Sequence, residues 1–202
     1  MIGPVETNAS PNRRDTLAEA VLTIGMTRGL ERVSIREVAA EAGCSIGTVQ
    51  HYFRTKDEML VFAFRRVVER ATARAIAVDQ SRGVRRALVH IIAQLLPLDD
   101  ERRAETTVHL AFATRAAVDP KLAEVQAETL ETVRAELAEL LLAVQRESGR
   151  RTDRRRARRD AVRLLALVDG LALHAVSAPG QLTDEELLAT LRHALDGVLA
   201  PT

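Results

Sequence analysis

Residues 35–53 carry the most restrictive pattern in this chain, because small and apolar side chains recur there at the spacing of two short crossing helices. Ala39 stands where the second helix must cross closely above the first, so its side chain has to be small. Gly43 stands in the intervening turn, where a positive φ is cheap only for glycine. Val38 and Val49 supply apolar contacts between the two helices. The pattern predicts a helix–turn–helix.

Composition extends the helical prediction to the rest of the chain. Ala and Leu dominate the aliphatic residues, which favours helix over strand. The 10 glycines and 6 prolines gather at segment ends, unlike the frequent turn residues of a sandwich or barrel. Capping motifs and apolar periodicity predict about nine helices and no strand. We therefore expect an all-α fold.

Three segments follow from this reading. Residues 1–10 are expected to form a disordered arm, and residues 11–55 a three-helix domain that contains the helix–turn–helix. Residues 56–202 are expected to form a C-terminal helical domain for ligand binding and dimerisation.

Charge and cysteine content narrow the class of protein. The formal net charge is +1, and residues 1–57 hold seven basic and seven acidic side chains, so the chain is not a strongly basic nucleic-acid binder. The single Cys44 cannot form an internal disulfide, which fits a reducing cytosol. No segment approaches the roughly 18 apolar residues of a membrane helix. We expect a cytoplasmic protein.

No catalytic or metal-binding motif is present. The chain lacks G-x-S-x-G, H-E-x-x-H, G-x-G-x-x-G and P-loop sequences. Glu105 and His109 share a helix face, but no third or fourth metal ligand lies nearby in sequence. Asp169 and His174 diverge by about 140° on a helix, so Asp169 is expected at a dimer seam or at a kink by Gly170. We expect neither an enzyme nor a bound metal or cofactor.

The second helix of the helix–turn–helix has the composition of a segment that enters the major groove of DNA. Its leading residues are short or polar, Gly47 permits close backbone approach, and Gln50 can pair with an adenine edge. Ser34 and Lys56 begin helices whose free N–H groups attract phosphate. The candidate DNA contacts are Arg13, Ser34, Arg36, Ser45, Ile46, Gly47, Thr48, Gln50, His51, Tyr52 and Lys56. In the alternative reading, the segment is an ordinary αα-corner and His51 is a solvated surface histidine.

The segment SIREVAAEAGCSIGTVQHYFRTKDEML resembles the DNA-binding domain of TetR-family transcriptional regulators, from about Arg13 to Phe62. The shared motif comprises Ala39, Ala42, Gly43, Ser45, Gly47, Thr48, Tyr52, Phe53, Lys56 and Leu60. This resemblance implies that Tyr52 and Lys56 clamp phosphates and that Thr48 contacts the DNA backbone. Gln50 stands where the family usually has an aromatic residue, so no operator preference carries over. The segments LLPLDDERRAE and LLALVDGLALHAV are similar to the C-terminal domain of BetI-type members.

Two C-terminal helices carry more apolar surface than one small domain can easily bury. Residues 161–176 are apolar almost all round, and residues 185–199 place leucines at alternating three- and four-residue steps. A two-fold homodimer through a four-helix bundle would cover both helices. The predicted interface residues are Leu165, Val168, Ala172, Leu188, Leu191, Leu195 and Val198.

A ligand pocket is expected among the polar residues of the C-terminal domain. Phe112 shares a helix face with His109, and Arg115 lies one step further on. The candidate pocket residues are Phe64, His90, Gln94, His109, Phe112 and Arg115. They predict a mid-sized, largely apolar ligand with an anionic or carbonyl group near Arg115. In the alternative reading, Phe112 belongs to the core and the histidines are satisfied internally.

Together these features predict a ligand-responsive transcriptional regulator, a repressor, that binds a palindromic operator in double-stranded DNA as a homodimer. A small, largely apolar effector would release it. The alternatives are a DNA-associated structural protein without effector, which leaves about 140 residues unexplained, and a small helical enzyme or metal-binding protein. Residues 146–159 contain eight arginines. They are interpreted as a solvated loop in preference to a second nucleic-acid patch.

Overall fold

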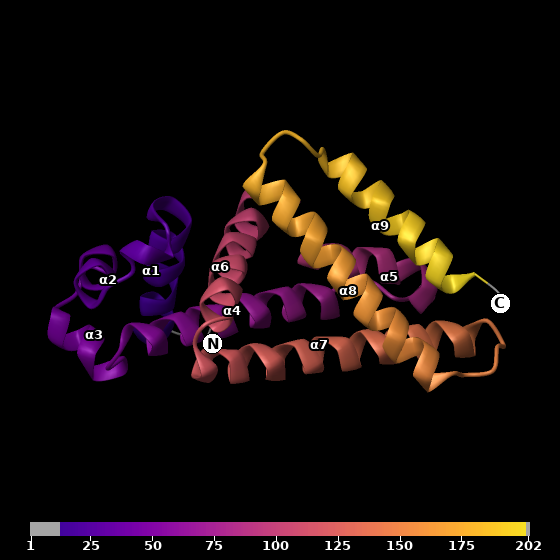
Figure 1. Ribbon diagram of the computed structural model, residues 1–202, viewed down its shortest axis with the longest axis horizontal. Coiled ribbons are helices and arrows are strands. Elements are labelled where there is room, and N and C mark those ends of the chain that lie inside the picture. The colour runs from indigo at the N-terminus through magenta and orange to yellow at the C-terminus, as the bar shows by residue number, and fades with distance from the viewer. Residues whose placement is uncertain (1–12, 201–202) are drawn as a thin grey trace, which may run out of the picture. The chain divides into compact units, whose positions relative to one another are not determined.

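The computed structural model describes residues 13–200, except for the side chain of Leu30 (Figure 1). Nine α-helices and two 3-10 turns occupy this range, and no strand occurs within it, which confirms the all-α prediction. The α-helices are α1 (Arg13–Arg28), α2 (Ile35–Glu41), α3 (Ile46–Tyr52), α4 (Lys56–Ile76), α5 (Val84–Ile92), α6 (Asp100–Ala116), α7 (Pro120–Glu147), α8 (Arg154–Ser177) and α9 (Asp184–Leu199). The 3-10 turns are η1 (Leu30–Arg32) and η2 (Ala93–Leu95).

The predicted arm at residues 1–10 lies outside the described residues. Between residues 13 and 200, no helix combines the length and the apolar character that a bilayer crossing demands.

The chain divides into two compact units, Met1–Ala63 and Phe64–Thr202, and the division falls inside α4. The sequence interpretation places the division at residues 55 and 56, where that helix begins.

Side-chain caps fix where α2 and α3 begin in the first unit. Ser34 Oγ accepts the backbone N–H of Glu37 at 3.2 Å, and Ser45 Oγ accepts that of Thr48 at 3.1 Å. Gly43 has a φ of 60°, so the turn between the helices uses the left-handed conformation that the sequence predicts there.

A small core holds α2 and α3 against α1 and the first turns of α4. Arg28 of α1 forms ion pairs with Glu37 and Glu41 of α2, which adds a polar tie between these helices. The Arg14 guanidinium lies 4.5 Å from the centre of the Phe62 ring, within range of a cation–π interaction. The buried core residues of this unit include Leu17, Val21, Ile24, Val38, Ala39, Val49, Phe53, Met59 and Leu60.

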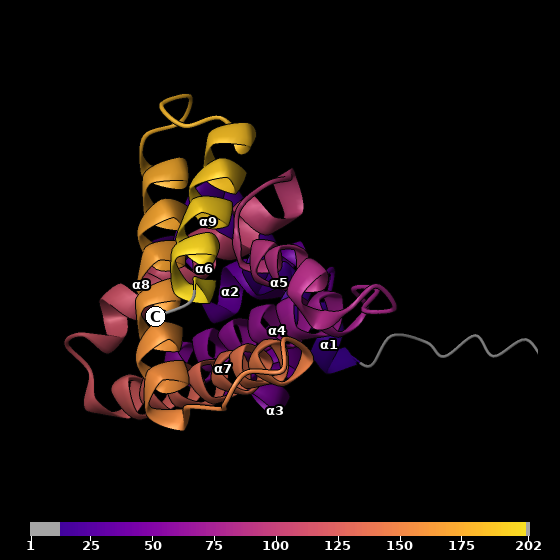
Figure 2. The same cartoon turned by 90° about the vertical axis from the view of Figure 1, so that its right-hand side faces the viewer.

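In the second unit, α7 and α8 are the longest helices and pack against each other along the main core. After the turn that follows α8, α9 returns beside it (Figure 2). The core between these helices and α5 includes Leu88, Ile92, Leu96, Leu137, Leu141, Leu142, Leu164, Val168, Leu187, Leu191 and Leu195.

The N-terminus of α5 is capped from the end of α7. Its N-cap residue, Gly83, has no side chain to accept a hydrogen bond. The Glu147 carboxylate instead accepts the backbone N–H groups of Val84 at 3.0 Å and Arg85 at 3.4 Å. A carboxylate at this position also complements the positive end of the helix dipole.

The arginine-rich stretch at residues 146–159 is partly helical, which corrects its interpretation as a solvated loop. Arg154 to Arg159 form the first turns of α8, which begins seven residues earlier than the expected start at Ala161. Asp153 caps this helix by accepting the backbone N–H of Arg156 at 2.9 Å. Arginine is a good helix former, so the helix extends as far as its cap even where the apolar periodicity is absent.

Candidate DNA interface and ligand cavity

The leading face of α3 is exposed and carries the residues that the sequence assigns to base contacts. Gly47, Gln50 and His51 are exposed on this helix, and Ile46 keeps 48% of its surface accessible. The exposed N-cap Ser45 lies beside them, 2.9 Å from the hydroxyl of the half-buried Thr48. Hydrogen-bonding groups at the start of an exposed helix are what major-groove readout requires.

Gly47 has no conformational reason to be glycine, because a Cβ built there meets only Ser45 Oγ, at 3.7 Å. We expect Gly47→Ala to leave the fold intact and to stabilise it by up to about 0.5–1 kcal/mol, as alanine does in helices. The added methyl group should nevertheless weaken DNA binding by roughly tenfold, about 1.4 kcal/mol, by holding the backbone away from the groove. Thermal unfolding and fluorescence anisotropy measure the two effects.

Gly197 offers a matched control, since it is an exposed helical glycine whose Cβ would meet nothing within 4 Å. Gly197→Ala should stabilise the protein similarly and leave DNA affinity unchanged. Undiminished affinity in Gly47→Ala would show that α3 does not approach DNA closely at this residue.

The other candidate DNA-contact residues differ in solvent exposure and in the contacts that they already make. Arg13, Ser34 and Arg36 are exposed. Tyr52 is half-buried, with the His51 ring edge-on at a centroid distance of 5.0 Å. The Lys56 ammonium donates a hydrogen bond to the backbone carbonyl of Glu31 at 3.0 Å, so a phosphate would have to share or replace this contact.

The second unit contains a partly open cavity of about 100 Å³ between α4, η2, α6, α7 and α8. Its wall is mostly apolar, with a few polar groups, as is usual for ligand sites. The lining residues are Val67, Val68, Ala71, Thr72, Arg74, Gln94, Leu95, Arg102, Glu105, Thr106, His109, Thr129, Leu130, Val133, Leu165, Asp169 and Ala172.

Three of the charged lining residues are held by other protein groups. The Arg74 guanidinium donates two hydrogen bonds to the Glu105 carboxylate, at 3.2 and 2.5 Å, and the pKa of Arg74 is raised chiefly by this contact. Arg102 donates to the Asp99 carboxylate at 2.8 Å and to the carbonyl of Ala93 at 3.2 Å. These three side chains therefore use their hydrogen-bonding groups on other protein groups.

His109 and Asp169 are the other two titratable groups in the wall. Neither forms a hydrogen bond or an ion pair with any residue between 13 and 200. Burial lowers the pKa of His109, which the Asp169 charge opposes, so the imidazole is neutral at pH 7. Burial raises the pKa of Asp169, which His109 and Arg134 oppose. The two groups line the cavity from α6 and α8.

The structure brings only part of the predicted ligand set to this cavity. Gln94 and His109 line it, whereas His90 is exposed and Arg115 is not among the lining residues. Phe64 and Phe112 are fully buried and stack on each other at 4.1 Å, with Phe64 5.7 Å from the His109 ring. His90 and Arg115 therefore lie outside the lining of this cavity, and Phe64 packs beside His109 from the core.

Asp169 is the cavity residue that the sequence interpretation misplaced, since a dimer seam or a kink was expected there. Its partner in the wall, His109, lies 60 positions earlier in the chain, so helical spacing gives no indication of the pair. Glu105 was considered as a metal ligand, but its carboxylate is engaged by Arg74. Residues 13–200 contain no group of three or more His, Cys, Asp or Glu side chains placed to hold a metal ion.

The residues predicted at the dimer interface belong to the fold of the single chain. Val168, Leu191 and Leu195 lie in the main hydrophobic core, and Leu188 and Val198 pack against it. Leu165 and Ala172 line the cavity. Val168, Leu191 and Leu195 are covered by helices of their own chain and have little surface left for a partner, whereas Leu188 and Val198 are half-buried.

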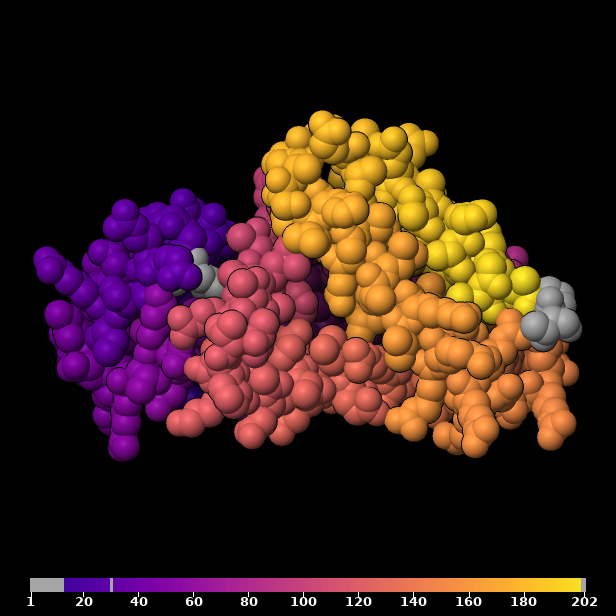
Figure 3. Space-filling view, viewed as in Figure 1, coloured from indigo at the N-terminus to yellow at the C-terminus, as the bar shows by residue number. Residues whose placement is uncertain are grey.

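Some apolar side chains on α8 remain exposed in the single chain, as do Ile76 and Val118. Val162 and Leu173 are 47% and 45% exposed, and Ala166 is exposed between them. Both α8 and α9 lie at the surface of the second unit on the face that Figure 3 shows.

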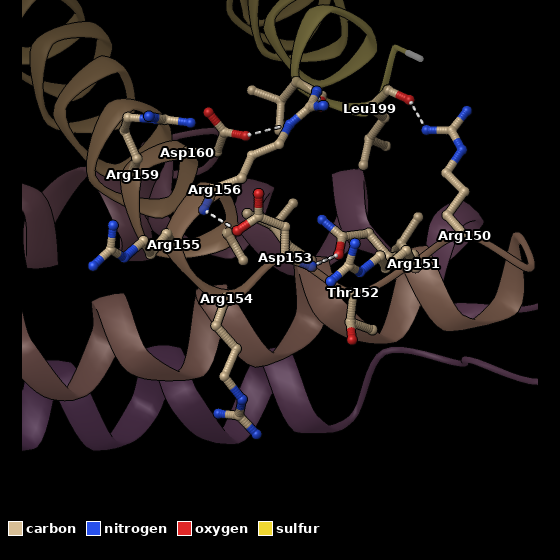
Figure 4. Close-up of a pocket in the computed structure, with 15 residues that line it drawn as sticks. Arg150, Arg151, Thr152, Asp153, Arg154, Arg155, Arg156, Arg159, Asp160 and Leu199 are labelled. Atoms are coloured by element: carbon tan, nitrogen blue, oxygen red, sulfur yellow. Dashed lines mark hydrogen bonds and ion pairs between the residues drawn. The ribbon is translucent and has the colours of Figure 1, made fainter. Parts of the chain in front are cut away.

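Two arginines between residues 146 and 159 donate hydrogen bonds to the end of α9 (Figure 4). Arg150 donates to the carbonyl of Leu199 at 2.8 Å, and Arg156 donates to those of Val198 and Ala200 at 3.1 and 3.2 Å. Arg156 also reaches the Asp160 carboxylate at 3.4 Å. These arginines have a structural role that their charge alone did not indicate.

Comparison with known proteins agrees with this arrangement. Residues 25–61 match the family described as bacterial regulatory proteins, tetR family, and residues 84–200 match the BetI-type transcriptional repressor C-terminal family. The HTH-type transcriptional regulator PksA of Bacillus subtilis is 31% identical over 188 residues, covering 92% of this chain and 89% of PksA.

Solved structures show the same fold. A transcriptional regulator from Rhodococcus sp. Rha1 superposes with a TM-score of 0.82 at 42% identity, over 93% of this chain and 96% of its own. A putative transcriptional regulator from Saccharomonospora viridis, crystallised with choline, has a TM-score of 0.78 at 24% identity and covers 91% of this chain and 95% of its own.

Proposed function

Because this chain belongs to the TetR family of bacterial transcriptional regulators, we propose that it is a repressor that releases its operator when a small molecule fills the cavity. The observation that carries this proposal is the combination of two features. The first unit presents an exposed, capped α3, and the second unit contains a cavity with two titratable groups, His109 and Asp169, that form no hydrogen bond to residues 13–200. The repressor acts in the cytoplasm and has no catalytic role.

The DNA half of the proposal uses the exposed face of α3. Gln50 and His51 face base edges, Gly47 allows the close approach, and Ser34, Arg36 and Arg13 bind phosphates. A homodimer places two copies of α3 in successive major grooves on one side of the duplex, about 34 Å apart. The operator is therefore a palindrome with half-sites one helical turn apart.

The effector half of the proposal uses α4 as the connection. This helix begins at Lys56, beside the helix–turn–helix, and Val67, Ala71 and Arg74 of the same helix line the cavity. A ligand that fits one orientation of α4 better than another shifts the spacing of the two α3 helices, typically by about 1–3 kcal/mol of coupling. The structure from Saccharomonospora viridis, solved with choline, supports a small-ligand role for this fold.

The homodimer forms through the exposed faces of α8 and α9. Val162, Ala166 and Leu173 provide the apolar part of this surface. An isologous contact through α8 and α9 pairs each helix with its copy and closes the assembly at two chains.

Selection of bound sequences from random DNA tests the proposed function without knowledge of the operator. The parent protein should enrich a palindrome, and Gln50→Ala should relax preference at one base pair per half-site, which costs about 1–3 kcal/mol. Enrichment of no common sequence by the parent protein would reject the regulator role. An unchanged motif with Gln50→Ala would reject the base contact alone.

A further inference from the structure

The carboxylate of Asp169 is the least satisfied charged group in the cavity wall. It is half-buried in a mostly apolar site and accepts no hydrogen bond from residues 13–200. A buried carboxylate normally accepts several hydrogen bonds or pairs with a cation, because its desolvation is otherwise expensive. Asp169 is therefore placed to accept hydrogen bonds from a ligand.

The groups that face Asp169 do not supply this partner. His109, from α6, is neutral at pH 7 and is not hydrogen-bonded to it. Arg134, from α7, contributes a positive charge at longer range and is not a lining residue. Arg74, Glu105 and Arg102 are engaged with one another or with other groups, as described above.

The composition of the wall distinguishes between kinds of cation. Recognition of a quaternary ammonium relies on a cage of aromatic rings. No Phe, Tyr or Trp stands among the lining residues, and His109 is the only ring. A protonated amine instead donates N–H hydrogen bonds, and a charge-assisted bond of this type is what the Asp169 carboxylate can accept.

An apolar groove of about 600 Å³ adjoins the cavity and shares Ala71, Thr72, Leu95 and Val133 with it. Its other apolar lining comes from α4, α5 and α7 and includes Ile91, Ile92, Leu137 and Leu140. The cavity itself, at about 100 Å³, has room for little more than an ammonium group and a few carbon atoms. A longer hydrocarbon chain would extend into the groove.

We propose that the effector is a hydrophobic amine whose protonated nitrogen donates hydrogen bonds to Asp169 and whose hydrocarbon part extends into the adjoining groove. This inference rests on the proposed function, because it names the chemical class of the molecule that fills the same cavity. It replaces the anionic or carbonyl group expected near Arg115 with a cation at Asp169.

Calorimetric titration of the full chain at pH 7.5, without DNA, tests the proposal with three probes of equal chain length: octylamine, 1-octanol and octyltrimethylammonium. The parent protein should bind octylamine most tightly. Asp169→Asn, which keeps the shape and removes the charge, should weaken octylamine binding by at least roughly tenfold, the loss of one charge-assisted hydrogen bond. Its binding of 1-octanol should not change.

Asp196→Asn serves as the matched control, since Asp196 is an exposed carboxylate on α9 outside the cavity. This variant should bind octylamine like the parent. The proposal is overturned if the parent does not bind octylamine, if Asp169→Asn binds it equally well, or if octyltrimethylammonium binds as tightly. Operator selection involves no ligand, so its failure would reject the repressor function and leave the amine result standing.

Thermal unfolding separates a ligand-binding role for Asp169 from a structural one. Burial makes the pKa of Asp169 higher in the folded protein than in the unfolded chain. The side chain therefore stabilises the fold at pH values below its unfolded-state pKa, and this contribution is lost as the pH rises through its folded-state pKa. Asparagine carries no charge that burial can disfavour, so Asp169→Asn should leave the Tm at pH 7.5 unchanged or raise it. A marked fall in Tm would assign Asp169 to the fold and overturn the proposal.

Discussion

Leu191→Glu is expected to abolish the folded chain, whereas Leu173→Glu is expected to leave it folded and monomeric. Leu191 has no exposed surface and lies in the core formed by α5, α7, α8 and α9. Burying an unpaired carboxylate there costs several kcal/mol in addition to the lost apolar contacts, a large part of the roughly 5–15 kcal/mol that stabilises a typical domain. Leu173 is 45% exposed on α8, so a carboxylate there keeps its water.

Circular dichroism and sedimentation equilibrium distinguish the two outcomes. The Leu173→Glu variant should keep the parent helix content and sediment with half the parent mass, because like charges would face each other across the two-fold axis. A dimer of unchanged mass would place the interface away from Leu173. A stable, helical Leu191→Glu variant would show that this residue is not buried in the protomer.

The second large effect is expected at the ion pair between α4 and α6. Glu105→Ala should destabilise the second unit by about 2–4 kcal/mol, because it leaves Arg74 without its hydrogen-bond acceptor in the cavity wall. The loss should fall toward the lower end of this range, because the Arg74 side chain is 27% exposed and therefore remains partly solvated. Arg70, 3.8 Å from the same carboxylate, loses a weaker contact. Urea denaturation measures the change.

The double variant Arg74→Met/Glu105→Met provides the control for this pair. Replacing both charges by apolar side chains removes the interaction without leaving a charge unpaired, and such replacements are frequently neutral or stabilising. The double variant should therefore recover most of the stability that Glu105→Ala loses. Equal losses in the two variants would mean that packing, and not the unpaired guanidinium, determines the effect.

The helix–turn–helix could be predicted residue by residue because its determinants are local. Ser34, Ala39, Gly43 and Ser45 act on neighbours within a few positions, through caps, a close crossing and a positive φ. The same local rules predicted about nine helices, as observed between residues 13 and 200. They missed the start of α8 only because Asp153 stands among arginines that carry no apolar periodicity.

The cavity and the dimer surface could not be predicted in the same way. The spacing of Leu191 and Leu195 shows that one face of α9 is buried, but it does not show whether α8 of the same chain or a second chain covers that face. Likewise, His109 and Asp169 line the same cavity only because α6 and α8 pack on each other. Such assignments depend on contacts between residues far apart in sequence.

The arginine contacts at the end of α9 should restrain fraying of its last turn. The last carbonyls of a helix usually have no protein partner, and the final turn therefore frays. Here Arg150 and Arg156 bind the carbonyls of Val198, Leu199 and Ala200, and so connect this turn to the segment between α7 and α8 and to the first turn of α8. The last turn of α9, the connecting segment and the first turn of α8 should therefore open as one cooperative unit, with amide hydrogens exchanging at similar rates.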